Sequence, residues 1–215
     1  MNPARKATQV AFFVLCLVGN AEARDAVIAK RYMVAAAHPL AAEAGAEVLK
    51  RGGSALDAAV AVQMVLGLVE PESSGIGGGA FLLHWSEREK KLRSYDGRET
   101  APLAAQPDRF LKEGKPMGFL EAAVGGRSVG VPGVLRMLEL AHQRHGRLPW
   151  NQLFLPAIRV AEEGFVVSPK FVEALERAPD MKKHYPASRI VNGAIAIDLR
   201  HPQRRDVVAG RQRTE

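Results

Sequence analysis

The amino-acid sequence predicts a mixed α/β (α+β) fold. Two segments with alanine and leucine at helical spacing come first, two short apolar runs joined by a charged turn follow, and three further helical segments complete the patterned part. Hydrophobic residues make up 47% and charged residues 25% of the 215 residues. This balance is typical of a globular protein with one sizeable core.

The amino terminus has the pattern of an export signal. Arg5 and Lys6 precede the apolar run Val10–Val18, and Ala21–Ala23 supply the small residues of a signal-peptidase site. The run is shorter than the roughly 20 residues that a membrane-spanning helix needs, so we expect no stable membrane anchor. Cleavage after Ala23 removes the signal peptide with Cys16, the single cysteine. We therefore expect a periplasmic or extracellular protein without disulfides.

The mature chain is expected to begin with a short strand and two helices. The strand is predicted over residues 32–36. The helix that follows, "PLAAEAGAEVLKRGG", closes at Gly52 and Gly53. In the next segment, "SALDAAVAVQMVLGLVEP", Ser54 is the predicted N-cap and Asp57 its capping-box partner. This second helix is apolar nearly all round, which predicts burial.

The middle of the chain predicts a β-hairpin, and the part after it predicts three more helices. The apolar runs "AFLLHWS" and "LRSYDGRE" flank a charged connection, although no Asn-Gly turn sets their register. The later helices are expected over residues 132–146, over residues 149–164 and from Ser168 onward. From Pro186 on, the periodicity is lost.

The stretch "SSGIGGGAFLLHWS" formally contains a dinucleotide fingerprint. Gly75, Gly77 and Ala80 fit the pattern G-x-G-x-x-A. That site needs a strand before the loop and a helix after it, so that the phosphates meet the helix amino terminus. Here a helix precedes the loop and a strand follows it. We therefore expect the glycines to allow a tight backbone passage rather than to bind phosphate.

The segment "GRSVG" matches the nucleophile elbow of serine hydrolases, with Ser128 as the serine. An elbow needs an apolar strand directly before it and an unbroken helix directly after it. "EAAVGG" is a poor strand, and Pro132 with Gly133 interrupt the helix. The sequence therefore disfavours a serine hydrolase.

Metal and nucleic-acid sites are also disfavoured. His142 and His145 are spaced to share a helix face, but no third ligand is placed near them. The formal net charge is +7, yet the cations are scattered and no aromatic residues lie among the arginines of the carboxyl-terminal segment. We expect no cofactor, no metal and no nucleic-acid partner.

The stretch "SYDGRETAP" places Arg98 between Asp96 and Glu99 at the end of a predicted strand. A guanidinium group held by neighbouring carboxylates presents a planar fork that binds another carboxylate in two places. The residues alone leave two alternatives open, a structural ion network and an anion clamp.

Four segments taken together resemble the amino-terminal part of the γ-glutamyltranspeptidase family. They are "AAAHPLAAEAGAEVLKRGGSALDAAVAVQMVLGLVEPESSGIGGGAFLL", "YDGRETAP", "GGRSVGVPGVLRMLELAHQRHGRLPW" and "LFLPAIRVAEEGFVVS". The resemblance runs in order and nearly continuously from about residue 32 to about residue 178. It implies an N-terminal-nucleophile hydrolase fold, a four-layer α/β/β/α sandwich built from a precursor that cleaves itself into a large and a small subunit.

The resemblance also implies a reaction and a role for one residue. The reaction is transfer of a γ-glutamyl group from glutathione or another γ-glutamyl amide to water or to an amino acceptor. In this mechanism the amino-terminal Thr of the small subunit attacks the amide, with its own α-amine as base. By its position in the motif, Arg98 corresponds to the arginine that binds the α-carboxylate of the γ-glutamyl group, which favours the anion clamp.

Two departures from the family pattern shape the functional prediction. The nucleophilic Thr corresponds to none of the three threonines, Thr8, Thr100 and Thr214, and the segment 187–215 no longer resembles the family. We therefore expect a signal peptide (1–23), the amino-terminal part of a large subunit (24–186) and a divergent tail. The first hypothesis is a fragment that needs the remainder of the large subunit and the small subunit for activity. The alternative is a noncatalytic module that binds γ-glutamyl compounds.

Overall fold

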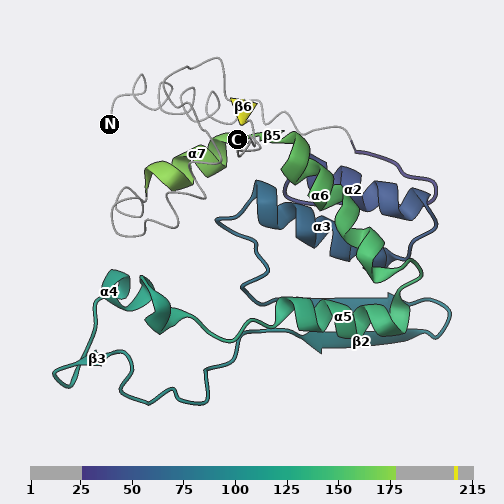
Figure 1. Ribbon diagram of the computed structural model, residues 1–215. Coiled ribbons are helices and arrows are strands. Elements are labelled where there is room, and N and C mark those ends of the chain that lie inside the picture. Colours follow the sequence, from purple (N-terminus) through teal and green to yellow (C-terminus); the bar gives the residue numbers. More distant parts are fainter. Residues whose placement is uncertain (1–25, 178–205, 208–215) are drawn as a thin grey trace, which may run out of the picture. The chain divides into compact units, whose positions relative to one another are not determined.

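The computed structural model describes residues 26–177 and 206–207. The chain divides into two compact units, Met1–Tyr32 and Met33–Glu215. Of the first unit, residues 26–32 are described, and they form no helix or strand. All helices and strands considered below belong to the second unit, and Figure 1 shows their order along the chain.

Helices α2 (Pro39–Lys50) and α3 (Ala55–Val69) form where the sequence predicts them. The imidazole of His38 accepts a hydrogen bond from the Leu40 amide and so caps α2. At the start of α3, the Ser54 hydroxyl accepts from the Asp57 amide, and the Asp57 carboxylate accepts from the Ser54 amide. This is the predicted capping box, with both of its hydrogen bonds present.

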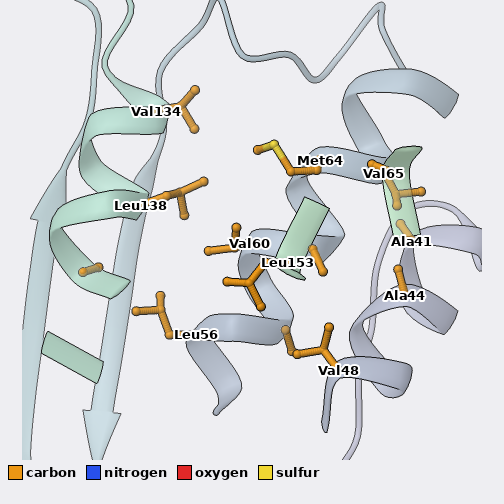
Figure 2. Packing of buried hydrophobic residues seen from close by; sticks show 14 of the residues in the cluster. Ala41, Ala44, Val48, Leu56, Val60, Met64, Val65, Val134, Leu138 and Leu153 are labelled. Carbon is orange, nitrogen blue, oxygen red and sulfur yellow. The ribbon is translucent and has the colours of Figure 1, made fainter. Parts of the chain in front are cut away.

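The core is built around α3. Figure 2 shows Leu56, Val60 and Met64 of α3 between α2 and α5 (Val134–His145). Leu153 of the 3₁₀-helix η2 (Trp150–Phe154) packs into the same cluster and is completely buried. Apart from Ala55, no residue of α3 is exposed, which confirms the predicted burial of this helix.

Strands β1 (Phe81–Ser86) and β2 (Lys91–Asp96) form the predicted hairpin, and the pairing of Phe81 with Asp96 sets its register. Successive side chains of a strand point to opposite faces. Tyr95 lies on the inner face, where α5 packs on β2, as Figure 1 shows. The outer face carries four exposed apolar side chains, and we call this set the outer hairpin face: Phe81, Leu83, Trp85 and Leu92.

Residues 97–133 connect the hairpin to α5 through short elements. They include the two-residue strands β3 (Leu111–Lys112) and β4 (Lys115–Pro116), helix α4 (Phe119–Ala123) and the 3₁₀-helix η1 (Gly126–Ser128). No residue from 98 to 133 is buried, although the segment has many apolar side chains. We call residues 98–133 the open segment.

The carboxyl-terminal part contains α6 (Leu155–Glu163), β5 (Phe165–Val166), α7 (Pro169–Glu176) and β6 (Asp206–Val207), which pairs with β5. The predicted helix over 149–164 is divided into η2 and α6. Pro156 explains the division, because it has no amide hydrogen to continue α-helical bonding from the preceding turn. Ser168 caps α7 as predicted, since its hydroxyl accepts from the Phe171 amide at 3.1 Å.

The strand predicted over residues 32–36 is wrong, because these residues form no regular element. A strand needs a hydrogen-bonding neighbour, and the segment lies instead along α2. A Cβ atom on Gly45 would come within 2.9 Å of the Val34 side chain, so this side chain packs directly on α2. Ala36 packs against the core from the same segment.

Several predictions lie outside the described residues. These are the signal peptide with Cys16 and its cleavage site, and the divergent tail except for residues 206–207. The boundary after residue 186 is likewise untested and stays a prediction. None of the helices formed by residues 26–177 is long and apolar enough to cross a membrane.

Candidate functional site

The glycine loop and the end of β2 meet at a close backbone crossing. Ala80 and Gly97 exchange two backbone hydrogen bonds, of 3.2 and 2.9 Å. A Cβ atom on Gly79 would lie 2.6 Å from the Gly97 carbonyl oxygen, and one on Gly133 would lie 2.5 Å from the same oxygen. Real Cβ atoms do not approach other atoms this closely, so these glycines are needed for packing.

The glycine loop also stabilises the start of α5. The carbonyl oxygen of Gly78 accepts hydrogen bonds from the amides of Gly133 and Val134, each at 3.2 Å. Helix amino termini leave such amides without intrahelical partners, and α5 has no side-chain cap there. The loop thus uses a carbonyl oxygen, rather than amide groups that bind phosphate, at this helix end. This agrees with the predicted structural role of the glycines.

The need for glycine differs along the loop. Gly79 has no room for a side chain, whereas a Cβ on Gly75 or Gly77 would meet no atom within 4 Å. Gly77 lines the clefts described below. The prediction that all of the loop glycines serve packing is therefore confirmed for Gly79 and does not extend to Gly75 and Gly77.

Arg98 lies immediately after the crossing. Its backbone amide donates to Asp96 Oδ1 at 2.9 Å, which holds the chain in a turn as it leaves β2. Its guanidinium Nη1 lies 3.1 Å from Glu99 Oε2, and 56% of the side chain is exposed. Both carboxylates that flank Arg98 in the sequence therefore contact it, one through the backbone and one through the side chain. The guanidinium group keeps donors free for a further partner.

Two clefts meet at Arg98 and Glu99. One has a volume of about 580 Å³ and lies over the glycine loop, with Gln63, Ser74 and Gly75 in its wall. The other has a volume of about 600 Å³ and is formed mainly by the open segment. Its wall includes Arg98, Glu99, Arg109, Phe110, Arg127 and Ser128. We call this second space the arginine cleft.

Ser128 does not have the geometry of a hydrolase nucleophile. It ends the 3₁₀-helix η1, and its hydroxyl donates to the carbonyl oxygens of Ala123 at 2.6 Å and Gly125 at 3.1 Å. The element before it is the helix α4 rather than a strand. The "GRSVG" match is therefore a coincidence of sequence, as expected.

His142 and His145 have separate partners. His142 Nε2 lies 2.9 Å from the Leu148 carbonyl oxygen, whereas His145 Nε2 lies 2.7 Å from the Tyr95 hydroxyl oxygen. Burial lowers the pKa of the His145 imidazole, and the stacked His84 ring, 3.9 Å away, adds to this effect. Among the residues that the structure describes, no three potential metal ligands come together.

Asp57 has a larger role than its sequence position suggested. It is completely buried, and its Oδ2 accepts hydrogen bonds from the amides of Ser54, Arg147 and Leu148 at 2.8, 2.9 and 3.2 Å. The carboxylate therefore ties the start of α3 to the loop after α5. The capping box was visible in the sequence, but no local pattern connects Asp57 with residues about 90 positions away.

Known proteins resemble this chain over most of its described length. The Gamma-glutamyltranspeptidase family model matches residues 41–199, and so continues past residue 186. The glutathione hydrolase proenzyme of Bacillus subtilis (strain 168) is 46% identical over 155 residues, which cover 72% of this chain and 26% of the relative. The chain thus spans about a quarter of the length of such relatives.

Solved structures show the same likeness in three dimensions. The γ-glutamyltranspeptidase of Helicobacter pylori superposes with a TM-score of 0.71 at 33% identity, covering 75% of this chain and 46% of that one. That of Pseudomonas nitroreducens, in complex with L-DON, has a TM-score of 0.68 at 36% identity, covering 73% and 46%. These matches confirm the predicted N-terminal-nucleophile hydrolase class, of which the chain contains a part. The chain belongs to the γ-glutamyltranspeptidase family.

Proposed function

We propose that this chain acts as the amino-terminal part of a γ-glutamyltranspeptidase large subunit, in which Arg98 binds the α-carboxylate of the γ-glutamyl donor. The reaction of the complete enzyme is transfer of the γ-glutamyl group of glutathione, or of another γ-glutamyl amide, to water or to an amino acceptor. The observation that carries the proposal is the position of Arg98, exposed at the meeting point of two clefts and oriented by Asp96 and Glu99.

The environment of Arg98 supports a clamp more than a purely structural ion network. A structural network uses all of its charges internally, whereas Arg98 pairs with Glu99 through one guanidinium nitrogen. The remaining N–H groups have the fork geometry that binds a carboxylate in two places. The ion pair with Glu99 limits the conformations of the side chain, so less entropy is lost when a substrate binds.

The nucleophile of the proposed reaction is an amino-terminal Thr supplied by the small subunit. Thr100 is the one threonine among the described residues; it lines the arginine cleft, and its backbone is bridged to Val131. It directly follows the Arg98 motif and does not correspond to the family's nucleophile, which opens the small subunit. We further propose that the protein is exported, to the periplasm or the extracellular space, after cleavage following Ala23.

Binding of two matched anilides tests the role of Arg98. γ-Glutamyl anilide carries the α-carboxylate, and 4-aminobutyryl anilide lacks it. We expect the chain to bind the first about tenfold more tightly, the size of one hydrogen-bonded charge pair. Arg98→Ala removes the difference and Arg98→Lys keeps part of it, whereas Arg136→Ala, on the exposed face of α5, leaves it unchanged. Equal binding of both anilides by the unmodified chain contradicts the proposal.

Both functional hypotheses predict no turnover by the chain alone, and the DNA downstream separates them. We expect the chain by itself to release no aniline from γ-glutamyl anilide, because the nucleophile comes from the small subunit. Turnover that disappears with Arg98→Ala would show that the nucleophile lies in this chain. If the DNA downstream encodes the rest of the large subunit and a Thr-led small subunit, the enzyme fragment is supported. Unrelated downstream sequence together with a folded, soluble product favours the noncatalytic module.

A further inference from the structure

We propose that the arginine cleft is a second anion subsite, in which Arg109 and Arg127 bind a carboxylate on the leaving-group side of the γ-glutamyl donor. The inference rests on the proposed function, because it takes Arg98 as the clamp for the α-carboxylate. The proposed subsite makes the protein prefer γ-glutamyl donors that carry a second carboxylate beyond the scissile amide.

The charges that line the cleft are unbalanced. Its wall contains three guanidinium groups and one carboxylate, that of Glu99. Glu99 is paired with Arg98. Arg109 and Arg127 therefore add positive charge to the cleft that no lining carboxylate offsets. A concave surface of one charge sign raises the local concentration of ligands of opposite charge.

Neither Arg109 nor Arg127 has a carboxylate within 4 Å among the described residues, in contrast to most other described arginines. Arg93, Arg136 and Arg159, for example, each pair with a glutamate elsewhere on the surface. Four other described arginines, Arg31, Arg51, Arg144 and Arg147, also lack such a partner, but Arg144 and Arg147 line a cleft that contains Glu87 and Glu89. Arg109 and Arg127 lie together in the arginine cleft, beside the proposed clamp. An anion from outside the chain is the partner that this arrangement lacks.

Both side chains are held in place by neutral acceptors. Arg109 Nη2 donates to the Gly126 carbonyl oxygen at 3.3 Å, and Arg127 Nη1 donates to the Arg109 carbonyl oxygen at 3.0 Å. Arg127 Nη1 also lies 3.0 Å from Met117 Sδ. These contacts tie the two backbones to each other without neutralising either charge. Each guanidinium group has five N–H donors, so most donors stay free for a ligand.

The two sides of the cleft are connected close to Arg98. Thr100 and Val131 exchange backbone hydrogen bonds of 3.3 and 2.9 Å. A Cβ atom on Gly130 would lie 2.8 Å from Glu99 Cβ, so the chain after η1 packs directly on the chain after β2. This bridge keeps Arg98 and the Arg127 side of the cleft in one local structure, as two-point binding of a dicarboxylate requires.

Two probes that differ in one charge test the subsite. γ-Glutamylglycine carries a second carboxylate, which γ-glutamylglycinamide replaces with a neutral amide. We expect the full chain to bind γ-glutamylglycine about fivefold more tightly, the size expected of exposed ion pairs. Ligand-observed NMR titrations at low ionic strength measure both dissociation constants. The double variant Arg109→Gln with Arg127→Gln brings the ratio to about one.

The controls separate a local subsite from the overall charge of the chain. The double variant Arg88→Gln with Arg136→Gln also removes two positive charges. These side chains are 90% and 80% exposed and lie outside the arginine cleft. We expect it to keep the fivefold ratio, and matching circular dichroism spectra confirm that both double variants fold. The subsite is overturned if the unmodified chain binds both probes equally. It is also overturned if the control double variant loses the preference for γ-glutamylglycine as fully as the variant of Arg109 and Arg127.

The same titrations distinguish this inference from the role of Arg98. Arg98→Gln weakens binding of both probes equally if Arg98 is the clamp for the α-carboxylate. If Arg98→Gln changes neither dissociation constant, the clamp is wrong. If the preference for γ-glutamylglycine is then still lost with Arg109→Gln and Arg127→Gln, the arginine cleft binds anions although the proposed role of Arg98 fails.

Discussion

The helical core around α3 and the open segment differ in how they use polar groups. In the core, the buried Asp57 carboxylate accepts three backbone hydrogen bonds from the protein itself. In the open segment, no residue is buried, and the guanidinium groups of Arg109 and Arg127 have neutral partners alone. The core thus satisfies Asp57 Oδ2 with backbone amides of the chain itself, while Oδ1 accepts no hydrogen bond and lies 3.4 Å from His142 Nε2. The open segment keeps charges available for a ligand.

This difference has a physical basis. A buried charge without partners is very costly, so a carboxylate in the core persists where hydrogen bonds satisfy it. An exposed guanidinium group is hydrated and costs little to leave free. Stability and binding are therefore assigned to separate parts of the chain, and mutations in the two parts should have different consequences.

Removal of the Asp57 side chain is expected to have the largest effect on stability. Asp57→Ala leaves the amides of Ser54, Arg147 and Leu148 without their acceptor inside the core. Unsatisfied buried groups cost about 1–3 kcal/mol each, so we expect the free energy of unfolding to fall by about 3 kcal/mol or more. Urea denaturation at low protein concentration, followed by circular dichroism, measures this change.

Asp108→Ala is the matched control in the open segment. Asp108 is exposed and makes no side-chain hydrogen bond or ion pair among the described residues. Its removal should change the free energy of unfolding by less than about 0.5 kcal/mol. Equal effects of the two substitutions would remove the contrast between core and open segment.

The glycine loop lies between the two regions and should respond differently at two positions. Gly79→Ala brings a Cβ atom within 2.6 Å of the Gly97 carbonyl oxygen and 2.8 Å of Arg98 Cα. Such overpacking costs about 1–3 kcal/mol. Gly77→Ala meets no atom within 4 Å, so we expect a change within about 0.5 kcal/mol. Denaturation curves of both variants test this, and a costly Gly77→Ala would contradict the description of the loop.

Substitutions on the outer hairpin face should have the smallest effect on the free energy of unfolding and the largest effect on self-association. The four side chains of this face lie side by side, and each exposes between 53% and 71% of its surface. They belong to a two-stranded sheet with open edges. We expect the chain to self-associate and to bind a hydrophobic dye, because apolar side chains exposed side by side favour association. We propose that the rest of the sandwich covers this face in the complete enzyme. Leu83→Thr lowers dye fluorescence with a change in stability below about 0.5 kcal/mol.

Leu103→Thr is the control for the hairpin experiment. Leu103 is fully exposed in the open segment and lies outside the outer hairpin face. Dye fluorescence should not change when it is replaced. A clean monomer that binds no dye and unfolds cooperatively would show that the outer hairpin face needs no cover.

Local sequence signals predicted most of the secondary structure. Ser54, Ser168 and Gly146 mark helix ends that the structure confirms, because caps depend on residues within one turn. The hairpin followed from two short apolar runs. The strand over residues 32–36 failed because a strand depends on a partner that lies elsewhere in the chain.

The candidate site was predictable in part. Arg98 was identified from its flanking carboxylates and from the family resemblance, and its role as a carboxylate clamp stays a proposal. Nothing in the sequence marked Arg109 or Arg127 as an anion ligand, although Arg127 lies within the "GRSVG" match. They share a cleft with Arg98 because the bridge between Thr100 and Val131 joins two distant parts of the open segment.

The sequence by itself determined the helix ends, the hairpin and the argument against a phosphate loop, because each of these depends on residues close together in the chain. It also determined the family, through four segments that follow one another in the family's order. The tertiary structure alone decided which glycines are needed for packing, what Asp57 binds and which arginines share a cleft. These properties depend on atoms brought together from distant positions in the chain. Asp57 and Leu148 are 91 residues apart in the sequence and 3.2 Å apart in the fold.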